Sequence, residues 1–329
     1  IARKPENLTV KCTREIAFYI LNEKRDNLLT IETTYGISVF IVPKRLVKPD
    51  GSLGERNDVR AQSIEHKLGI HASPTCTMVF GDKGGAVGYL VGEENNGIAC
   101  MFTMMNRARL AIGLEGVAIG ETATQHALAY ARERRQGHAV GQPGHDAAPI
   151  VEHPDVKRML LCMRALTNAA RAICYSTAMA IDKARVARDA AARQAANARA
   201  ALLTPVAKAF STEVGSEVAS LGIQVHGGMG FIEETGAAQF YRDARVAQIY
   251  EGTNGIQAID LVTRKLPMAG GEALAAFLAE LRRTVAAVRA SNDPAFGAAG
   301  IRLDEAAGSL ERASAWLAAK LRDQPTMAL

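Results

Sequence analysis

The sequence predicts a mainly α-helical protein in which a bundle of long helices follows a short β-region. Two observations support this fold class. Apolar residues recur at helical spacing through residues 98–135, 156–191 and 192–221. Before them, short β-branched runs bounded by glycine and proline occupy residues 36–97. The 329 residues suffice for one large or two medium domains with a sizeable core.

Composition narrows the class of protein and its partners. The net charge of +5 suits anionic ligands such as nucleotides, but the basic residues are too dispersed to predict nucleic-acid binding. Five widely spaced cysteines favour reduced thiols and a cytoplasmic protein. No apolar run approaches the length of a membrane span, and no signal peptide is visible. His66 and His71 lack further ligands nearby, so no metal is expected.

The N-terminal third divides into an unassigned segment and a β-region. Strands are predicted within residues 36–44, 77–80 and 89–92, with a turn at residues 50–54. Residues 1–35 have no assignment, and a real extension, a frame error or a foreign sequence are all open. Because the chain begins with isoleucine, we expect it to be a fragment, a processed product or the product of an interrupted reading frame.

The helical region extends from residue 98 to residue 266 and is broken by glycines at residues 227–230. Without side chains, the backbone at this break can approach a bulky ligand. Helices flank the break, so it is not the strand-turn-helix glycine motif of nucleotide-binding folds. After a linker at residues 267–271, alanine-rich stretches at residues 273–290 and 304–322 predict two more helices.

One acidic residue stands between an apolar segment and a flexible Gly-Thr-Asn-Gly turn. This residue is Glu251, and Thr253 or Asn254 can cap the helix that follows. A carboxylate beside unpaired helix N–H groups, if apolar groups desolvate it, has a raised pKa and can act as a base. The alternative is an ordinary charge at a helix N-terminus, and chemistry alone favours that alternative.

Three motifs, in order and at matching spacing, resemble the acyl-CoA dehydrogenase family. YEGT at residues 250–253, followed by Ile-Gln, resembles the catalytic segment. QVHGGMGF at residues 224–231 resembles the flavin-contacting turn, and YRDAR at residues 241–245 resembles the helix before the catalytic acid. The resemblance implies that residues 36–97 are part of a middle β-domain and residues 98–266 are the C-terminal helical bundle. It implies that residues 267–329 begin an extra helical region found in a bacterial branch.

The resemblance also implies roles for individual residues. Glu251 would be the catalytic base. Flavin contacts are implied for Arg134, Gln136, Gln224, Val225, His226, Gly227, Gly228, Thr253, Asn254 and Gly255. Substrate contacts are implied for Asn106, Arg109 and Gly252. Three positions depart from the family pattern. Asn106 stands where an aspartate is usual, Gly137 replaces an aromatic residue near the flavin diphosphate, and Gly255 stands where many relatives have a glutamine, so a side-chain contact is absent there.

A complete relative would use FAD to convert an acyl-CoA thioester to the trans-2-enoyl-CoA. Electrons would pass to an electron-transferring flavoprotein, and the enzyme would be a homodimer or homotetramer. The bacterial branch acts on fatty acyl-CoA or on 3-methylthiopropanoyl-CoA, and the sequence does not select between them. An acyl-CoA oxidase, a DNA-associated member of the superfamily and a non-catalytic truncated homologue remain alternatives. Because the family's N-terminal domain is missing from these residues, we expect the chain alone to bind FAD weakly or not at all.

Overall fold

The computed structural model describes residues 38–141, 146–291 and 293–324. It forms two compact units, Ile1–Ala108 and Arg109–Leu329. The unassigned segment, residues 1–35, lies outside the described residues. Side chains inside the first helix are not described for residues 98, 99, 101–104 and 106. No helix in the described part of the chain is long and apolar enough to cross a membrane.

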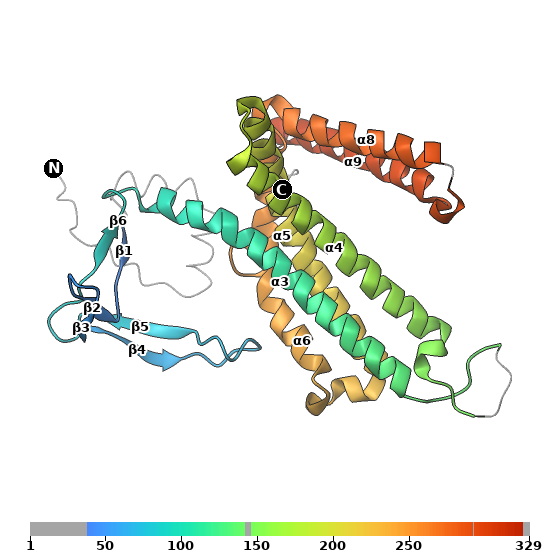
Figure 1. The fold of residues 1–329 in the computed structure, drawn as a ribbon, viewed down its shortest axis with the longest axis horizontal. Coiled ribbons are helices and arrows are strands. Elements are labelled where there is room, and N and C mark those ends of the chain that lie inside the picture. The colour runs from blue at the N-terminus through green and yellow to red at the C-terminus, as the bar shows by residue number, and fades with distance from the viewer. Residues whose placement is uncertain (1–37, 142–145, 292, 325–329) are drawn as a thin grey trace. The chain divides into compact units, whose positions relative to one another are not determined.

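In the described part of the first unit, from residue 38 on, the strands form three antiparallel pairs (Figure 1). The pairs are β1 (Val39–Ile41) with β6 (Tyr89–Val91), β2 (Arg45–Val47) with β3 (Leu53–Arg56), and β4 (Val59–Ile64) with β5 (Cys76–Phe80). The buried amide of Asn57 joins two loops, donating to the carbonyls of Pro43 at 2.9 Å and Val87 at 2.8 Å. The predicted strands correspond to β1, β5 and β6. Sequence reasoning missed β2, which is only three residues long, and β3 and β4, which are rich in charged and polar residues.

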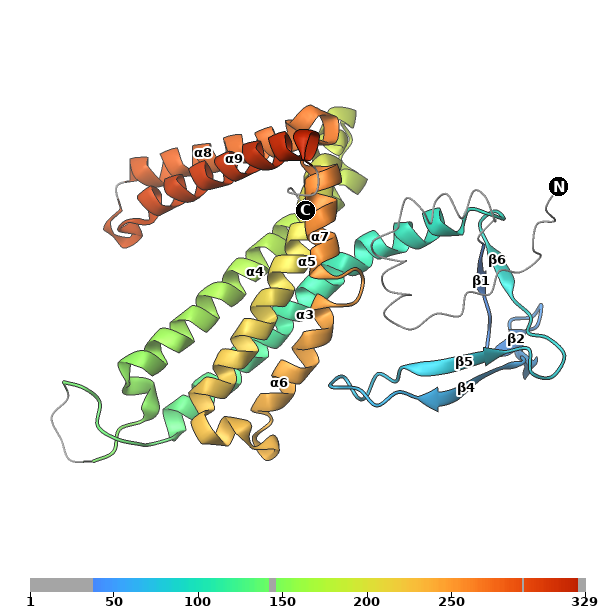
Figure 2. The same cartoon turned by 180° about the vertical axis from the view of Figure 1, so that it is seen from behind.

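The second unit is a bundle of helices, as predicted. Three long helices run side by side in both views: α3 (Gly97–Glu133), α4 (Pro154–Val186) and α5 (Ala190–His226) (Figures 1 and 2). Two short helices, α6 (Ala237–Ala244) and α7 (Asn254–Asp260), pack along α5. Asp189 caps α5 by accepting from the Ala192 N–H at 2.7 Å. The bundle core consists of small and medium apolar residues, including Val117, Ala127, Met163, Ala170, Ala207, Val214 and Val218.

Two glycines bring α3 and α5 into backbone contact. A Cβ added at Gly116 would lie 2.2 Å from the Ser211 carbonyl oxygen, and one added at Gly215 would lie 2.8 Å from the Gly116 oxygen. No side chain fits at that distance, so glycine at both positions permits the close crossing. The crossing holds α5 against α3 next to the loop that precedes α7.

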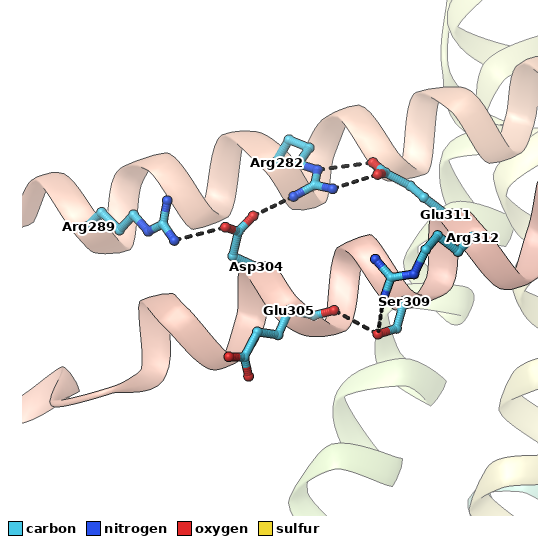
Figure 3. Close-up of polar contacts among 7 residues, drawn as sticks. All are labelled: Arg282, Arg289, Asp304, Glu305, Ser309, Glu311 and Arg312. Atoms are coloured by element: carbon cyan, nitrogen blue, oxygen red, sulfur yellow. Dashed lines mark hydrogen bonds and ion pairs between the residues drawn. The ribbon is translucent and has the colours of Figure 1, made fainter.

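A helical hairpin ends the described chain. Helices α8 (Glu272–Ser291) and α9 (Ala299–Asp323) lie side by side in both views (Figures 1 and 2). They correspond to the two alanine-rich helices predicted at residues 273–290 and 304–322. Few of their side chains are buried; Val285 and Ala307 are the buried apolar pair. Charged residues bridge the helices instead (Figure 3). Arg282 bonds both oxygens of Glu311 and also Asp304, and Arg289 donates to Asp304 at 2.8 Å.

Candidate functional site

The predicted catalytic acid lies in a loop with an unusual backbone. Glu251 is half-buried and has a φ of +55°, which is uncommon for a residue with a side chain. Gly252 follows with a φ of +86° and is buried; a Cβ there would lie 2.8 Å from Gln257 Nε2. Left-handed backbone at a non-glycine residue persists only where the surroundings hold it. The loop therefore needs contacts that fix it.

Contacts from α7 fix one side of the loop. Thr253 caps α7, its hydroxyl accepting from the Ile256 N–H at 3.3 Å, as one of the two predicted caps. The buried amide of Gln257 reaches back and donates to the Gly252 carbonyl at 3.1 Å, with the Glu251 carbonyl at 3.5 Å. These bonds hold the carbonyls of the two left-handed residues against the first turn of the helix.

Residues far away in sequence fix the other side. The phenol of Tyr250 donates to the carboxylate of Glu115 on α3, 135 residues earlier. Burial, and then this carboxylate, raise the pKa of Tyr250 above its ordinary range, so the phenol stays protonated. The side chain of Asn254 contacts α5, where it donates to Glu213 Oε1 at 2.8 Å and to Thr212 Oγ1 at 3.1 Å.

A buried ion pair lies beneath the loop. Arg109 on α3 and Asp260 on α7 are 4% and 1% exposed, and their side chains meet at 3.2 Å. Asp260 also pairs with Arg264 at 2.6 Å. Burial lowers the pKa of Arg109, and the carboxylate of Asp260 opposes that shift. Arg109 bonds Asp260 through Nη1, while its buried Nε has no hydrogen-bond partner among the described residues, and its predicted contact with substrate stays a prediction.

A second group of predicted residues lies at one end of the bundle. The last turn of α5 continues into a 3₁₀ turn, Gly227–Phe231. Gln224, Gly227 and Gly228 are exposed, and a Cβ at either glycine would meet nothing within 4 Å. Val225 and His226 are buried, so any contact they make with a ligand is limited to the main chain.

His226 is held inside the bundle by its ring. Nδ1 is 2.7 Å from the Gly222 carbonyl, and the ring stacks on Tyr130 at a centroid distance of 4.3 Å, with His126 at 4.7 Å. Desolvation lowers the pKa of His226, which favours the neutral ring. This stacking joins the last turns of α3 and α5, directly before the glycine turn.

Of the three remaining predicted flavin contacts, Gly255 is exposed in the first turn of α7, and the other two follow α3 at the glycine-turn end. Arg134 and Gln136 are exposed, and the Arg134 guanidinium donates to Gln136 Oε1 at 3.4 Å. Arg134 comes one turn after Tyr130, which stacks on His226, so it lies at the glycine-turn end of the bundle. The predicted residues thus form two groups within this chain, one at the Glu251 loop and one at the helix ends.

Comparison with known proteins identifies the family. Residues 95–266 match the family model described as acyl-CoA dehydrogenase, C-terminal domain. The chain belongs to the acyl-CoA dehydrogenase family. Both groups of site residues lie within the matched range. Residues 1–54 match a different family model, RNase E/G, thioredoxin-like domain, which covers the unassigned segment and extends to β3.

Relatives of this acyl-CoA dehydrogenase chain include two curated bacterial enzymes. It is 53% identical over 240 residues to 3-methylmercaptopropionyl-CoA dehydrogenase of Ruegeria pomeroyi, covering 73% of this chain and 40% of that protein. It is 38% identical over 253 residues to a butyryl-CoA dehydrogenase of Syntrophomonas wolfei, covering 75% and 42%. The chain therefore spans about two fifths of the length of these relatives. A solved acyl-CoA dehydrogenase of Bacillus anthracis complexed with FAD shares 26% identity with a TM-score of 0.57, over 70% of this chain and 39% of that one.

For this acyl-CoA dehydrogenase chain, the family motifs located the loop and the glycine turn but not their support. Sequence reasoning did not single out Glu115 and Asp260, which contact Tyr250 and Arg109. It also did not single out Lys208 on α5, which donates to Asn254 Oδ1 at 2.9 Å. The side chain of Asn106 lies outside what the structure describes, so its predicted substrate contact stays a prediction. Among the described residues, no group of three or more histidine, cysteine or acidic side chains is placed to hold a metal.

Proposed function

We propose that this chain carries the catalytic base and part of the flavin site of an enzyme that oxidises an acyl-CoA thioester to the trans-2-enoyl-CoA. The observation that carries the proposal is the Glu251 loop. A half-buried carboxylate stands on left-handed backbone that the contacts of Tyr250, Gln257 and Asn254 hold in place. A base fixed in this way meets its substrate without first being ordered.

Glu251 would remove the α-proton of the bound thioester. The α-carbon is acidic enough only if negative charge on the thioester oxygen is stabilised as it develops. We assign the backbone N–H of Glu251 to that oxygen, since the same residue then supplies both base and donor. Gly252, which has no room for a Cβ, would lie against the substrate. Arg109 would support the loop from below through Asp260.

The glycine turn fits a bulky cofactor such as FAD. A Cβ at Gly227 or Gly228 meets open space, so a large planar or phosphorylated group can lie against this backbone. FAD, when bound, would supply the acceptor for the β-hydrogen, which leaves as hydride. Thr253 and Gly255 would contact it near the Glu251 loop, and Gln224 near the glycine turn. Asn254 would act through its main chain, because its side chain is bonded to α5.

Arg134 and Gln136 would serve the flavin diphosphate of a second subunit. Guanidinium geometry suits phosphate, and both side chains are exposed at the end of the bundle away from the loop. This placement favours a homodimer or homotetramer. We further propose a cytoplasmic enzyme whose acceptor is an electron-transferring flavoprotein. The two curated relatives are named for 3-methylmercaptopropionyl-CoA and butyryl-CoA, and these are the first substrates to assay.

The test is a Glu251→Gln substitution in the full-length gene product, purified with its flavin. The amide keeps the size of the side chain and removes the base, so turnover should fall by about 10²- to 10⁴-fold or more. The measurement is acyl-CoA-dependent reduction of an artificial electron acceptor. Glu234→Gln, the same change at an exposed acid, is the matched control and should keep wild-type activity.

Three results would contradict the proposal. One is full activity in Glu251→Gln, which would show that another group is the base. A second is a wild-type enzyme whose flavin is not bleached by any acyl-CoA tested. The third is peroxide formation as fast as acyl-CoA consumption without added acceptor, which would indicate an oxidase.

A further inference from the structure

A buried lysine lies behind the Glu251 loop and has no role in the mechanism above. Lys208 is on α5, is 0% exposed, and is the largest fully buried side chain in the described part of the chain. Its Nζ donates to Asn254 Oδ1 at 2.9 Å. Burying an ammonium group costs several kcal/mol unless it is paired or hydrogen-bonded. An apolar side chain of the same length would fill this space without that cost. The role of the ammonium group must therefore lie in the hydrogen bond that it donates to Asn254.

That contact leads to the first residue of α7. Asn254 receives Lys208 on Oδ1, and its Nδ2 donates to Glu213, Thr212 and the Ala209 carbonyl at 2.8, 3.1 and 3.3 Å. The Thr212 hydroxyl lies 3.3 Å from Oδ1. Both ends of the amide are thus fixed to α5, and the amide cannot rotate without breaking these bonds. Because Asn254 is three residues after Glu251, this anchor restrains the loop directly.

Charged groups from three elements surround the ammonium. Arg109 and Glu115 face it from α3, Glu213 from α5 and Glu251 from the loop itself. Burial, followed by repulsion from Arg109, lowers the pKa of Lys208 to about 8, while the three carboxylates favour its charged form. The lysine therefore carries its charge at neutral pH and loses it as the pH rises through about 8.

We infer that Lys208 is a positioning residue for the proposed active site, holding the left-handed Glu251 loop in place through the side chain of Asn254. The inference rests on the proposed function. It explains how the second side of the loop is fixed, complementing Gln257, which holds the carbonyls from α7. A displacement of the base by about 1 Å can lower a rate by about 10²-fold, so an anchor of this kind matters for catalysis.

The test compares Lys208→Met with Asn254→Ala in the full-length, flavin-loaded gene product. Each should lower kcat by about 10- to 100-fold. The double variant should lose no more than Asn254→Ala alone, because Asn254→Ala already removes the Lys208 contact together with the bonds of Nδ2 to α5. Lys183→Met, the same substitution at an exposed lysine of α4, is the matched control and should behave as wild type.

The thermal stability of the variants and the pH dependence of the rate distinguish a positioning role of Lys208 from a purely structural one. Because burial lowers the pKa of Lys208, its charged form opposes folding below pH about 8, and Lys208→Met should not lower Tm. The wild-type rate should fall as the pH rises through about 8, and this fall should be absent in Lys208→Met. A rate that follows Tm across the variants would overturn the inference. If Lys208→Met does not fold, the pH profile of Asn254→Ala decides the inference: the fall through about 8 should be absent once the amide that links Lys208 to the loop is removed, and its persistence would overturn the inference.

Hydrogen exchange separates failure of the inference from failure of the proposed function. Amides of residues 251–257 should exchange faster in Lys208→Met, with those of α4 unchanged. If this occurs but wild type oxidises no acyl-CoA, the anchor stands and the proposed function fails. If wild type is active while Lys208→Met stays within about 2-fold of it and the loop amides are unchanged, the proposed function stands and the anchor is refuted.

Discussion

Two arginine–carboxylate clusters in this chain share the same chemistry but differ in exposure. In the bundle, Arg109 and Asp260 meet with side chains that are 4% and 2% exposed. In the α8–α9 hairpin, Arg282 and Glu311 meet with side chains that are 38% and 39% exposed. The first pair lies beneath the Glu251 loop, and the second bridges two helices at the surface (Figure 3).

The difference teaches that desolvation decides how much an ion pair matters when it is broken. A buried pair costs free energy to form, but losing one partner leaves an uncompensated charge away from water. A surface pair gains little, because water and salt replace it when it is lost. The bundle should therefore respond strongly to changes in its charges, and the hairpin weakly.

Asp260→Ala should produce the largest loss of stability. The substitution leaves the buried guanidinium of Arg109 unpaired, and the free energy of unfolding should fall by about 3–5 kcal/mol. Urea unfolding followed by circular dichroism measures it. Arg109→Met combined with Asp260→Met should recover much of the loss, since the buried guanidinium is removed with its partner and Arg264, which also pairs with Asp260, is partly exposed. If the double variant is as unstable as Asp260→Ala, shape and not charge dominates at this position.

The matched surface control is Asp155→Ala. Asp155 pairs with Arg158 on α4, where both side chains are largely exposed. Its removal should lower the free energy of unfolding by no more than about 1 kcal/mol, which covers both an exposed ion pair and an acid in the first turn of a helix. A larger loss there would contradict the link between exposure and effect that separates the two clusters.

Gly116→Ala should have the next largest effect and tests whether close backbone contact, as well as charge, holds the bundle together. The added Cβ would clash with the Ser211 carbonyl at 2.2 Å, so α3 and α5 must separate. The expected cost is about 1–3 kcal/mol, despite alanine's better helix propensity. Gly228→Ala meets nothing within 4 Å and should leave urea stability unchanged. Equal stability of the two variants would show that the helices adjust freely.

Sequence patterns predicted helices, whose apolar residues recur at regular spacing, and missed ion pairs between residues that are far apart in the sequence. The helical spacing of Met159, Met163 and Ala180 predicted a helix that the structure confirms as α4, although α4 ends at Val186 and not at residue 191. The family motifs located the loop through local order. In contrast, Arg109 and Asp260 are 151 residues apart, and nothing in either local sequence indicates the partner.

The burial of Lys208 is a second feature that sequence patterns did not predict. Its sequence neighbours on α5 are apolar and small residues, and a lysine is ordinarily expected at the surface of a protein. Its burial depends on Asn254, 46 residues later, supplying an acceptor. Polar residues that satisfy one another inside a bundle are therefore visible only once the helices are packed.

Arg282→Gln should have the smallest effect and should be local to the hairpin. Trp316 on α9 is the single tryptophan of the chain and is 49% exposed, so its fluorescence follows the hairpin while circular dichroism follows the whole. The substitution should shift the fluorescence transition slightly and leave the circular dichroism transition unchanged. In about 1 M salt, where the Debye length is about 3 Å, the shift should shrink.

The pH dependence of the stability of the hairpin shows whether the charge of Arg282 stabilises it. Arg282 lowers the pKa of Glu311 from its ordinary value of 4.5 in the folded hairpin. A carboxyl with a lowered folded pKa stabilises the fold above its ordinary value, and the contribution fades as the pH falls through the lowered one. Wild type and Arg282→Gln should therefore differ near pH 7 and converge in acid. If they stay equally far apart at low pH, Arg282 acts through packing of its aliphatic chain, and the contrast with the buried pair would no longer rest on charge.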